Sequence, residues 1–485
     1  MWTFLNMETR GGIFLVFSSL FFLCIFLPIC LGLYYINKNR TYRNWLLIIT
    51  SLIFYAWGEP VWISILLLST GFSYFSALLA EKYRGNVKGK IALIASIAGN
   101  LLILGFFKYS GFLIDNINGL IGTSIKVPEV GLPIGISFYT FKIISYIVDV
   151  YKGETEAQKS PFKLLLYVSL FHQLMAGPIT RYKDISEAID NRVETYQDFN
   201  YGVSRFIIGL GKKVILAGTA GKITDIFMGT DYTRLPLLGA WFGILMFALQ
   251  LYFDFSGYSD MALGLGSMFG FKYKENFDYP YISKSAGEFW RRWHISLGSF
   301  FRDYVYIPLG GNRKFRIRNL FIVWGLTGLW HGADWNFIIW GLYYFVLLVI
   351  EKAFLLKLFE KLPAIISRLY LWVAVLVGWV FFYHNDIGQA FRFLGIMFGP
   401  GANGISSPEL SIHFWNNAVF LIIALIGCTP VFSRIFKRLK EEGSKGKLIW
   451  FIETHGKPAF NIAVLVLSVI FLVGQSFSPF MYFKF

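Results

Sequence analysis

His331 is an ionisable imidazole within an apolar run that extends from Asn319 to Ile350. A titratable group inside a membrane segment is costly, so its presence there favours a functional role. The nearest upstream cations, Arg316 and Arg318, predict a water interface. The helix from that interface to His331 would rise roughly 18–20 Å, which places the ring near the middle of a ~30 Å hydrocarbon core.

A low dielectric disfavours charged histidine, so the ring of His331 should be neutral. A neutral imidazole is the form that a general base requires. It could take the proton from a hydroxyl that attacks a thioester carbonyl, an assistance worth ~10²–10⁴ in rate. One alternative is a histidine that is hydrogen-bonded between packed helices. Another is a metal ligand paired with Asp334, although a catalytic metal usually needs further ligands that are not obvious here.

A second histidine, His294, lies in a stretch rich in tryptophan and arginine. If this stretch is one helix, an apolar arc lies nearly opposite Arg291 and Arg302, with His294 on the border; the arc contains Phe289, Trp290, Trp293, Leu297 and Phe300. The helix is too short and too cationic to span a membrane. We therefore expect it at the cytoplasmic interface, with its aromatic side chains and His294 directed inward. The alternative is an amphipathic anchor with an incidental histidine.

The cations around His294 suit an anionic acyl donor from the cytoplasm, such as coenzyme A with its phosphates. The predicted donor-binding residues are Arg291, Arg292, Arg302, Arg313 and Lys314, with Trp290 beside them. Orientation by the positive-inside rule and attraction to anionic lipid explain these cations about equally well.

A polar patch follows the apolar residues 241–249 and extends from Gln250 to Asp260. Polar side chains at such a place either line an aqueous passage or bridge helices, and the sequence leaves both open. The predicted lining residues are Gln250, Tyr252, Asp254, Ser256, Trp330, Asp334 and Asn336. We expect His172 to be a packing histidine. The remaining histidines lie near predicted span ends or loops and should be solvated; they are His384, His413 and His455.

Membrane helices must position these residues, because 55% of the 485 residues are hydrophobic and only 15% are charged. On the order of a dozen apolar runs qualify as candidate spans, and several are short enough to be re-entrant. They cover about 13–36, 44–58, 61–80, 91–107, 131–150, 162–180, 203–227, 236–270, 319–350, 369–383, 415–436 and 459–478. The hydrophilic intervals are too short for a soluble domain, so we expect residues 1–485 to form one all-α membrane domain. Proline-containing pairs such as Gly177-Pro178 predict broken helices around an enclosed chamber.

The net charge of +16 comes from cations scattered through short loops. This distribution argues against nucleic acid and is typical of the positive-inside rule. It places residues 38–43, 81–90 and 284–318 in the cytoplasm and the N-terminus outside, with Met1–Arg10 opening a retained first span. Close packing of helices explains Gly264, Gly266 and Gly270. The three cysteines are unpaired within apolar segments, so we expect neither disulfides nor zinc.

Several motifs, taken in order, resemble those of the membrane-bound O-acyltransferases, in particular the branch of bacterial polysaccharide O-acetyltransferases. They are Leu132–Phe138 (LPIGISF), Met175–Ile179 (MAGPI), Tyr252–Asp260 (YFDFSGYSD), Phe289–Leu297 (FWRRWHISL), Phe301–Arg313 (FRDYVYIPLGGNR), Trp330–Ala333 (WHGA) and Ser478–Phe483 (SPFMYF). The chain departs from the pattern at His172, where proline is common, and at Lys142, where glutamine is common.

The resemblance implies a multi-helix fold with re-entrant or interfacial helices and a central passage between the membrane faces. It implies that His331 and His294 occupy the active site. It also implies transfer of an acetyl group from cytoplasmic acetyl-CoA, with no bound cofactor, to an extracytoplasmic polysaccharide through an SGNH-type partner, in a bacterial cytoplasmic membrane. The alternatives are transfer of a D-alanyl or fatty acyl group, and a proton-coupled transporter in which His331 and Asp254 relay protons.

Overall fold

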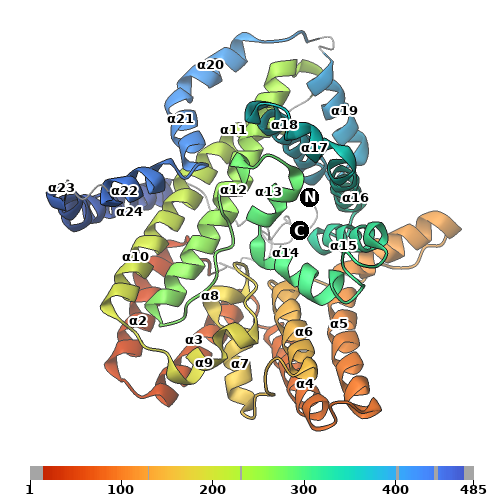
Figure 1. The fold of residues 1–485 in the computed structure, drawn as a ribbon, viewed down its shortest axis with the longest axis vertical. Coiled ribbons are helices and arrows are strands. Elements are labelled where there is room, and N and C mark those ends of the chain that lie inside the picture. The colour runs from red at the N-terminus through yellow and green to blue at the C-terminus, as the bar shows by residue number, and fades with distance from the viewer. Residues whose placement is uncertain (1–14, 129, 230–231, 400–402, 442–445, 475–485) are drawn as a thin grey trace.

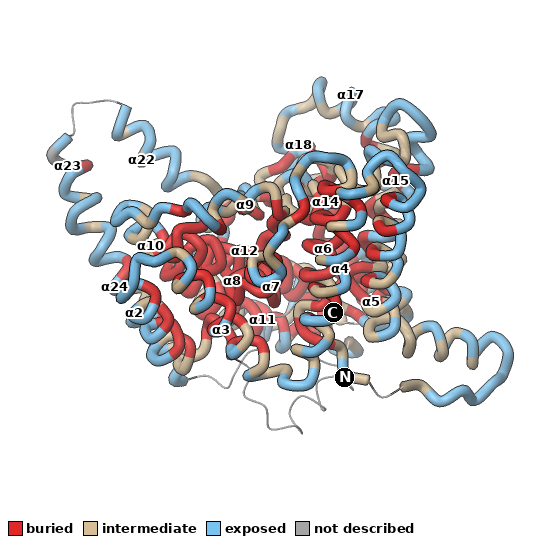
Figure 2. Tube along the Cα trace, turned by 90° about the horizontal axis from the view of Figure 1, so that it is seen from below, coloured by how far each residue is buried: buried red, intermediate tan, exposed pale blue. Residues whose placement is uncertain are grey.

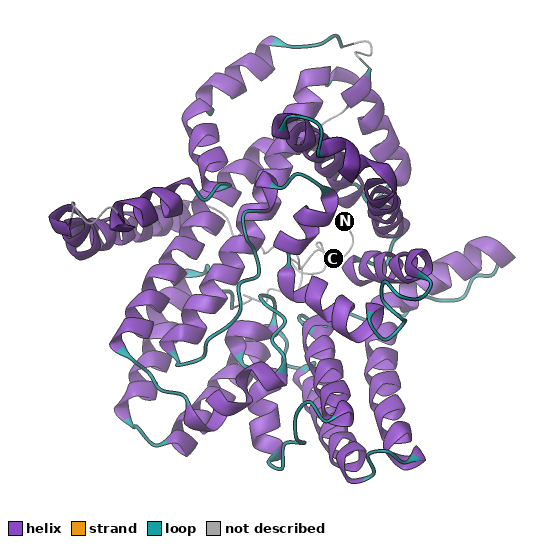
Figure 3. Ribbon diagram, in the orientation of Figure 1, coloured by secondary structure: helices purple, strands orange, loops and turns teal. Residues whose placement is uncertain are grey.

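The computed structural model describes residues 15–128, 130–229, 232–399, 403–441 and 446–474. All secondary structure within these ranges is helical (Figure 3), which confirms the predicted all-α class. The opening segment Met1–Arg10 and the closing motif Ser478–Phe483 lie outside the described residues.

The elements of the first half are η1 (Phe22–Phe26), α2 (Leu27–Ile36), α3 (Arg40–Gly58), α4 (Ile63–Lys82), α5 (Val87–Ile121), α6 (Ile136–Lys152), α7 (Pro161–Ser169), α8 (Phe171–Leu174), α9 (Tyr182–Asn191), α10 (Tyr196–Gly211), η2 (Lys212–Ala217), α11 (Gly218–Met228) and η3 (Tyr232–Arg234). Those of the second half are α12 (Leu237–Met268), η4 (Pro280–Ile282), α13 (Ala286–Arg292), α14 (Ile295–Phe301), η5 (Arg302–Tyr306), α15 (Arg316–His331), α16 (Trp335–Ile350), η6 (Glu351–Leu355), α17 (Leu356–Phe359), α18 (Ala364–Tyr383), α19 (Ile387–Phe398), α20 (Pro408–Asn416), α21 (Ala418–Gly427), α22 (Val431–Glu441), α23 (Gly446–Phe451), η7 (Ile452–Gly456) and α24 (Lys457–Gly474).

Fewer helices are long enough to cross a membrane than the apolar runs predict. Within the described residues six qualify by length and composition, or seven if α20 and α21, bent by 61°, form one span. The six are Ile63–Lys82, Val87–Ile121, Leu237–Met268, Trp335–Phe359, Ala364–Tyr383 and Leu448–Gly474. Several of the other runs fold into shorter or broken helices, because hydropathy reports how apolar a segment is but not where its helix stops.

The long helix α12 occupies the centre of the molecule, with α10 and α11 beside it (Figures 1 and 2). The backbones of α12 and α10 approach each other closely at two levels. A Cβ on Gly264 of α12 would lie 2.6 Å from the carbonyl oxygen of Gly202, and a Cβ on Gly209 of α10 would lie 2.5 Å from the carbonyl oxygen of Gly257. Close packing at Gly264 is therefore confirmed. Gly266 instead faces the ring of Tyr273 in the following loop, so the helix-packing explanation was wrong there.

The apolar run 319–350 folds into two antiparallel helices rather than one. α15 ends at His331, and α16 begins at Trp335 after three intervening residues, the first of which is an extended Gly332. The two helices meet where a Cβ on Gly341 would lie 3.2 Å from Cα of Gly328, a contact that larger residues would prevent. His331 is thus at a helix end and not in the middle of a helix.

The three predicted cytoplasmic clusters, residues 38–43, 81–90 and 284–318, share one side of the molecule, as the positive-inside rule requires. Helix α9, together with Arg181 directly before it, contacts residues in or next to all three clusters. Towards cluster 81–90, Lys183 pairs with Glu154 (2.5 Å), and Glu154 lines a cleft together with Arg84. Towards cluster 284–318, Arg181 pairs with Asp303 (2.6 Å). Next to cluster 38–43, the carbonyl of Ile189 accepts from Asn44 (3.0 Å). We call this side the basic side.

Glu194, in the loop between α9 and α10, should make the fold acid-sensitive. Burial alone would raise its pKa, but hydrogen bonds from Arg40 (2.8 Å) and Tyr34 (2.6 Å) lower the pKa to about 2. The ionised carboxylate therefore stabilises the fold above pH ~4.5, and this contribution is lost as the pH falls toward 2. In detergent, the unfolding temperature of the wild type should fall over this interval, whereas that of Glu194→Gln should start lower and change less. Parallel pH profiles for the two proteins would contradict the assignment.

Candidate active site

His331 lies among aromatic rings at the C-terminal end of α15. Its ring centroid is 4.8 Å from those of Trp330 and Trp340 and 5.2 Å from that of Phe382. The residue is only 3% exposed, so solvent barely reaches the ring in this conformation. Asp334, a predicted lining residue, caps α16 by accepting the Trp335 backbone N–H (2.7 Å) and so fixes the turn after His331.

The end of α15 is held by α5. Lys108 donates to the carbonyl oxygens of Trp330 and His331, and the hydroxyl of Tyr109 donates to that of Leu329 (2.7 Å). The last carbonyls of a helix have no partner within it, and its C-terminus carries partial negative charge. Since backbone at membrane depth must be satisfied by protein or enclosed water, a lysine at this position explains how α15 can stop there.

His294 lies at a break between α13 and α14 rather than within one helix, so the single-helix prediction was wrong. Its backbone is in the left-handed region (φ 46°, ψ 54°), which is costly for a residue with a side chain. Strain of this kind is commonly found at functional sites. The inward burial of the apolar arc is nevertheless as predicted, because Phe289, Trp293 and Leu297 are all buried.

Asn276 orients the His294 ring. Its Oδ1 accepts from the backbone N–H of Ser296 (3.1 Å), which identifies this atom as the oxygen, and it lies 3.2 Å from Nδ1 of His294. Because an acceptor needs a donor, Nδ1 of His294 carries the proton, and Nε2 has the lone pair. The nitrogen of Asn276 donates to Ser259 of α12 (3.2 Å), so α12 fixes the orientation of this side chain.

The rings of the two histidines both lie against the indole of Trp330. The Trp330 ring centroid is 4.8 Å from that of His331 and 5.8 Å from that of His294, which is itself 2% exposed. Phe141 of α6 stacks on the same indole at 5.8 Å. Residues that are 37 positions apart in sequence thus form one buried centre, which is the arrangement that a two-histidine active site requires.

Three buried polar hydrogens lie next to this centre without a hydrogen-bond partner among the described residues. They belong to the indoles of Trp290 and Trp340 and the hydroxyl of Tyr344. Their rings are in contact, with centroids 4.9–5.3 Å apart. Since buried donors are nearly always satisfied, we expect each of the three to meet a polar group of a ligand or a bound water.

The predicted donor-binding arginines differ in their availability. Arg292 is paired with Glu288 (3.0 Å) and Asp278 (2.8 Å), and Arg302 with Asp303 (2.6 Å). Arg291, Arg313 and Lys314 are all exposed, and none of the three forms an ion pair within the described ranges. Arg291 and Arg313 are therefore the arginines that remain available to an anionic ligand.

The polar patch on α12 separates into two faces. Asp254 pairs with Lys213 of η2, and Gln250 lies against Gly221 of α11, so these two residues bridge helices instead of facing the histidines. Tyr252 lies on the other face, 6.1 Å from Trp293. Ser256 is buried, and Asn336 donates to the Phe381 carbonyl of α18 (3.2 Å).

The prediction that His384 is solvated was wrong. It is 3% exposed because α18, η3 and α19 enclose it, and it hydrogen-bonds the hydroxyl of Tyr232 (3.2 Å). His172 hydrogen-bonds Tyr273 (3.0 Å), as expected of a packing histidine. Sequence reasoning missed Lys108 and Asn276. A lysine directly after the apolar run 91–107 was a usable signal, but nothing marked Asn276, which lies in a loop 18 residues before His294.

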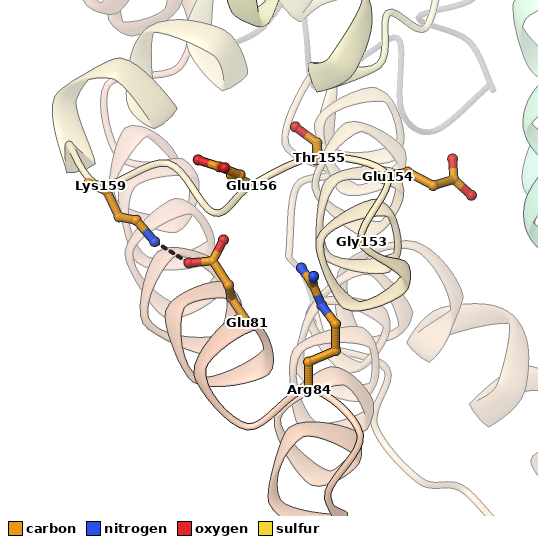
Figure 4. A pocket seen from close by; sticks show the side chains of 7 residues that line it. All are labelled: Glu81, Arg84, Gly153, Glu154, Thr155, Glu156 and Lys159. Atoms are coloured by element: carbon orange, nitrogen blue, oxygen red, sulfur yellow. Dashed lines mark hydrogen bonds and ion pairs between the residues drawn. The ribbon is translucent and has the colours of Figure 1, made fainter.

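A cleft of about 570 Å³ opens between α4 and the loop after α6 (Figure 4). It is lined by Glu81, Arg84, Gly153, Glu154, Thr155, Glu156 and Lys159. Three carboxylates outnumber two cations, and none of the predicted site residues lines it, so this cleft does not suit the phosphates of an acyl donor.

Replacing Asn276 with leucine should leave three donors, the backbone N–H and the hydroxyl of Ser296 and Nδ1 of His294, without this acceptor and should release the His294 ring. We expect turnover to fall about 10- to 100-fold with little change in KM, because a misplaced catalytic group lowers the rate more than binding. Asn276→Asp retains the acceptor oxygen and should recover much of the activity in an acyl-transfer assay. Asn44→Leu removes a buried asparagine near α9 as the matched control and should retain activity. Equal losses in both leucine variants would indicate a structural effect only.

The sequence of the chain is similar to those of several known proteins. Residues 14–387 match the family model of the membrane-bound O-acyltransferases. The chain is 40% identical to a probable alginate O-acetylase AlgI of Pseudomonas putida over 495 residues, which cover 97% of this chain and 100% of the relative. It is 33% identical to a peptidoglycan O-acetyltransferase of Helicobacter pylori, with 97% and 98% covered. It is 34% identical to a teichoic acid D-alanyltransferase of Bacillus subtilis, but over only 46% of this chain and 59% of that protein.

Proposed function

Because the chain belongs to the membrane-bound O-acyltransferase family, we propose that it transfers an acetyl group from cytoplasmic acetyl-CoA to hydroxyl groups of an extracytoplasmic polysaccharide. The observation that carries this proposal is similarity along nearly the whole chain to proteins named as O-acetyl transferring enzymes of alginate and peptidoglycan. The protein is a multi-pass membrane protein, and we place it in a bacterial cytoplasmic membrane with its basic side in the cytoplasm and its N-terminus outside.

In the proposed reaction, His331 is the general base. The hydroxyl oxygen of the acceptor attacks the thioester carbonyl, and its proton passes to His331. The carbon–sulfur bond then breaks, and the coenzyme A thiolate leaves with the proton that His331 returns. His294 presents the lone pair of Nε2 and orients the donor or stabilises charge near the reacting carbonyl. Burial of both rings supports this assignment, since a neutral imidazole acts as a base at physiological pH.

We propose that Arg291 and Arg313 bind the phosphates of the donor on the basic side, and that Trp290, Trp340 and Tyr344 hydrogen-bond its thioester arm. Their unpartnered donors support this route. Because His331 is closed off from solvent, the aromatic side chains around it must rotate to admit the thioester. An SGNH-type partner would supply the first acceptor hydroxyl and then pass the acetyl group on to the polysaccharide.

Transfer of a D-alanyl group is the second candidate, favoured by the similarity to the Bacillus subtilis D-alanyltransferase. That similarity covers less than half of the chain, which is why acetyl is preferred. A fatty acyl group has no observation in its favour. A proton relay between His331 and Asp254 is not supported either, because Asp254 is paired with Lys213 on the opposite face of α12.

The donor distinguishes these candidates. Purified protein incubated with labelled acetyl-CoA and a hydroxyl acceptor should release coenzyme A thiol at a rate that depends on His331, and a D-alanyl thioester on a carrier protein should not be consumed. Consumption of the aminoacyl thioester alone would replace acetyl by D-alanyl. Proton flux into liposomes without any acyl donor would instead favour the transporter.

A further inference from the structure

The helix α22 separates apolar and basic residues onto two faces. At 100° per residue its apolar side chains, Val431, Phe432, Ile435, Phe436 and Leu439, fall within one arc of about 140°. The four cations of the helix, Arg434, Lys437, Arg438 and Lys440, occupy the remaining arc and outnumber its single described carboxylate, Glu441. This composition is typical of a helix that lies in the plane of a membrane surface.

Much of the apolar face is uncovered by the described residues: Val431, Phe432 and Ile435 are exposed, whereas Phe436 and Leu439 are half-buried. Phe432 is 71% exposed and Ile435 is 51% exposed, and α22 stands away from the buried core together with α23 (Figure 2). Neighbouring side chains at the start of the final candidate span are exposed as well, including Trp450. An ion pair between Lys440 and Glu453 (3.0 Å) ties α22 to η7, so the helix lies next to the point where the span begins.

The contacts of α24 place α22 on the basic side. Asn461 donates to Ser204 (2.9 Å), and Gly211 lies against Val464, so α24 runs in the same direction as α10. α10 begins directly after Glu194, which is bound to Arg40 on the basic side. The segment that leads into α24 therefore lies on that side too. Helix α22 adds further positive charge to the surface that already holds the three basic clusters.

We propose that α22 binds the surface of the leaflet on the basic side, with its apolar face among the acyl chains and its cations on the headgroups of anionic phospholipids. Anionic lipid is favoured over a protein partner for two reasons. The cations flank the whole apolar arc, and the helix adjoins the start of a candidate span, which places it at the level of the lipid headgroups. The proposal is independent of the acyl-transfer reaction.

The test uses the full chain in nanodiscs. Cys24, Cys30 and Cys428 are replaced, and an environment-sensitive fluorophore is attached to a single cysteine in place of Phe432. In discs that contain phosphatidylglycerol, the emission should shift to the blue and be quenched by lipids with spin-labelled acyl chains. The triple variant R434Q/K437Q/R438Q should lower the ratio of inserted to exposed helix about 100-fold, because it removes the attraction of three cations to the anionic surface.

The matched control is I435K/K437I, which keeps composition and net charge but places a lysine in the centre of the apolar arc. It should abolish insertion while leaving charge-driven attraction intact. Aqueous emission from the wild type in phosphatidylglycerol discs would overturn the proposal and leave the face to a protein partner. Equal insertion in phosphatidylcholine discs would overturn the role of anionic headgroups, and equal insertion of the control variant would overturn the role of the apolar arc.

Discussion

Replacing His331 with alanine should reduce acyl transfer by about 10²- to 10⁴-fold, the contribution of a positioned general base. His331→Gln should be as inactive, because glutamine retains hydrogen-bonding capacity but cannot take a proton at neutral pH. Both variants should still insert and purify as folded protein. The measurement is release of coenzyme A thiol from acetyl-CoA at saturating donor, compared with the wild type.

His172 offers the matched control, since it is equally enclosed and contacts Tyr273 outside the histidine pair. His172→Gln should keep activity close to that of the wild type even if its unfolding temperature falls. If His331→Gln retained full turnover, His331 would not be the base, and a structural role at the end of α15 would be the better explanation.

Replacing Lys108 with methionine should lower turnover about 10- to 100-fold, although Lys108 does not touch the proposed reacting atoms. Methionine preserves the length and apolar stem of lysine but leaves the Trp330 and His331 carbonyls without their donor, which costs about 1–3 kcal/mol for a buried group. The end of α15 should then shift, and a displacement of about 1 Å can cost ~10² in rate. We expect kcat to fall with little change in the KM for the donor.

The chain contains a control for this substitution. Lys142 is also buried and donates to the carbonyls of Tyr167 (2.6 Å) and Val168 (3.2 Å) at the end of α7. Lys142→Met therefore removes the same type of contact away from His331 and should lower stability without the loss in kcat. Lys108→Arg keeps the charge and the donors and should recover part of the activity. Equal kcat in the two methionine variants would show that Lys108 does not position His331.

Several features were predictable because they depend on composition and local pattern. The apolar runs identified a helical membrane protein. The cation clusters at 38–43, 81–90 and 284–318 lie on one side of the molecule, as the positive-inside rule requires. The sequence singled out His331 as a candidate because an ionisable residue in an apolar run is rare on physical grounds. The burial of Phe289, Trp293 and Leu297 followed from their type alone.

Other features depend on what each segment meets after folding. The break at His294 and the stop of α15 at His331 were not predictable, because each is stabilised by residues distant in sequence, Asn276 for the first and Lys108 for the second. The role of Asp254 was likewise undecided until Lys213 was placed beside it. Sequence alone determined the residue types and the membrane setting, since hydropathy and charge are local properties. Tertiary structure alone decided which polar groups face one another, because satisfying buried hydrogen bonds requires partners that only the packed chain brings together.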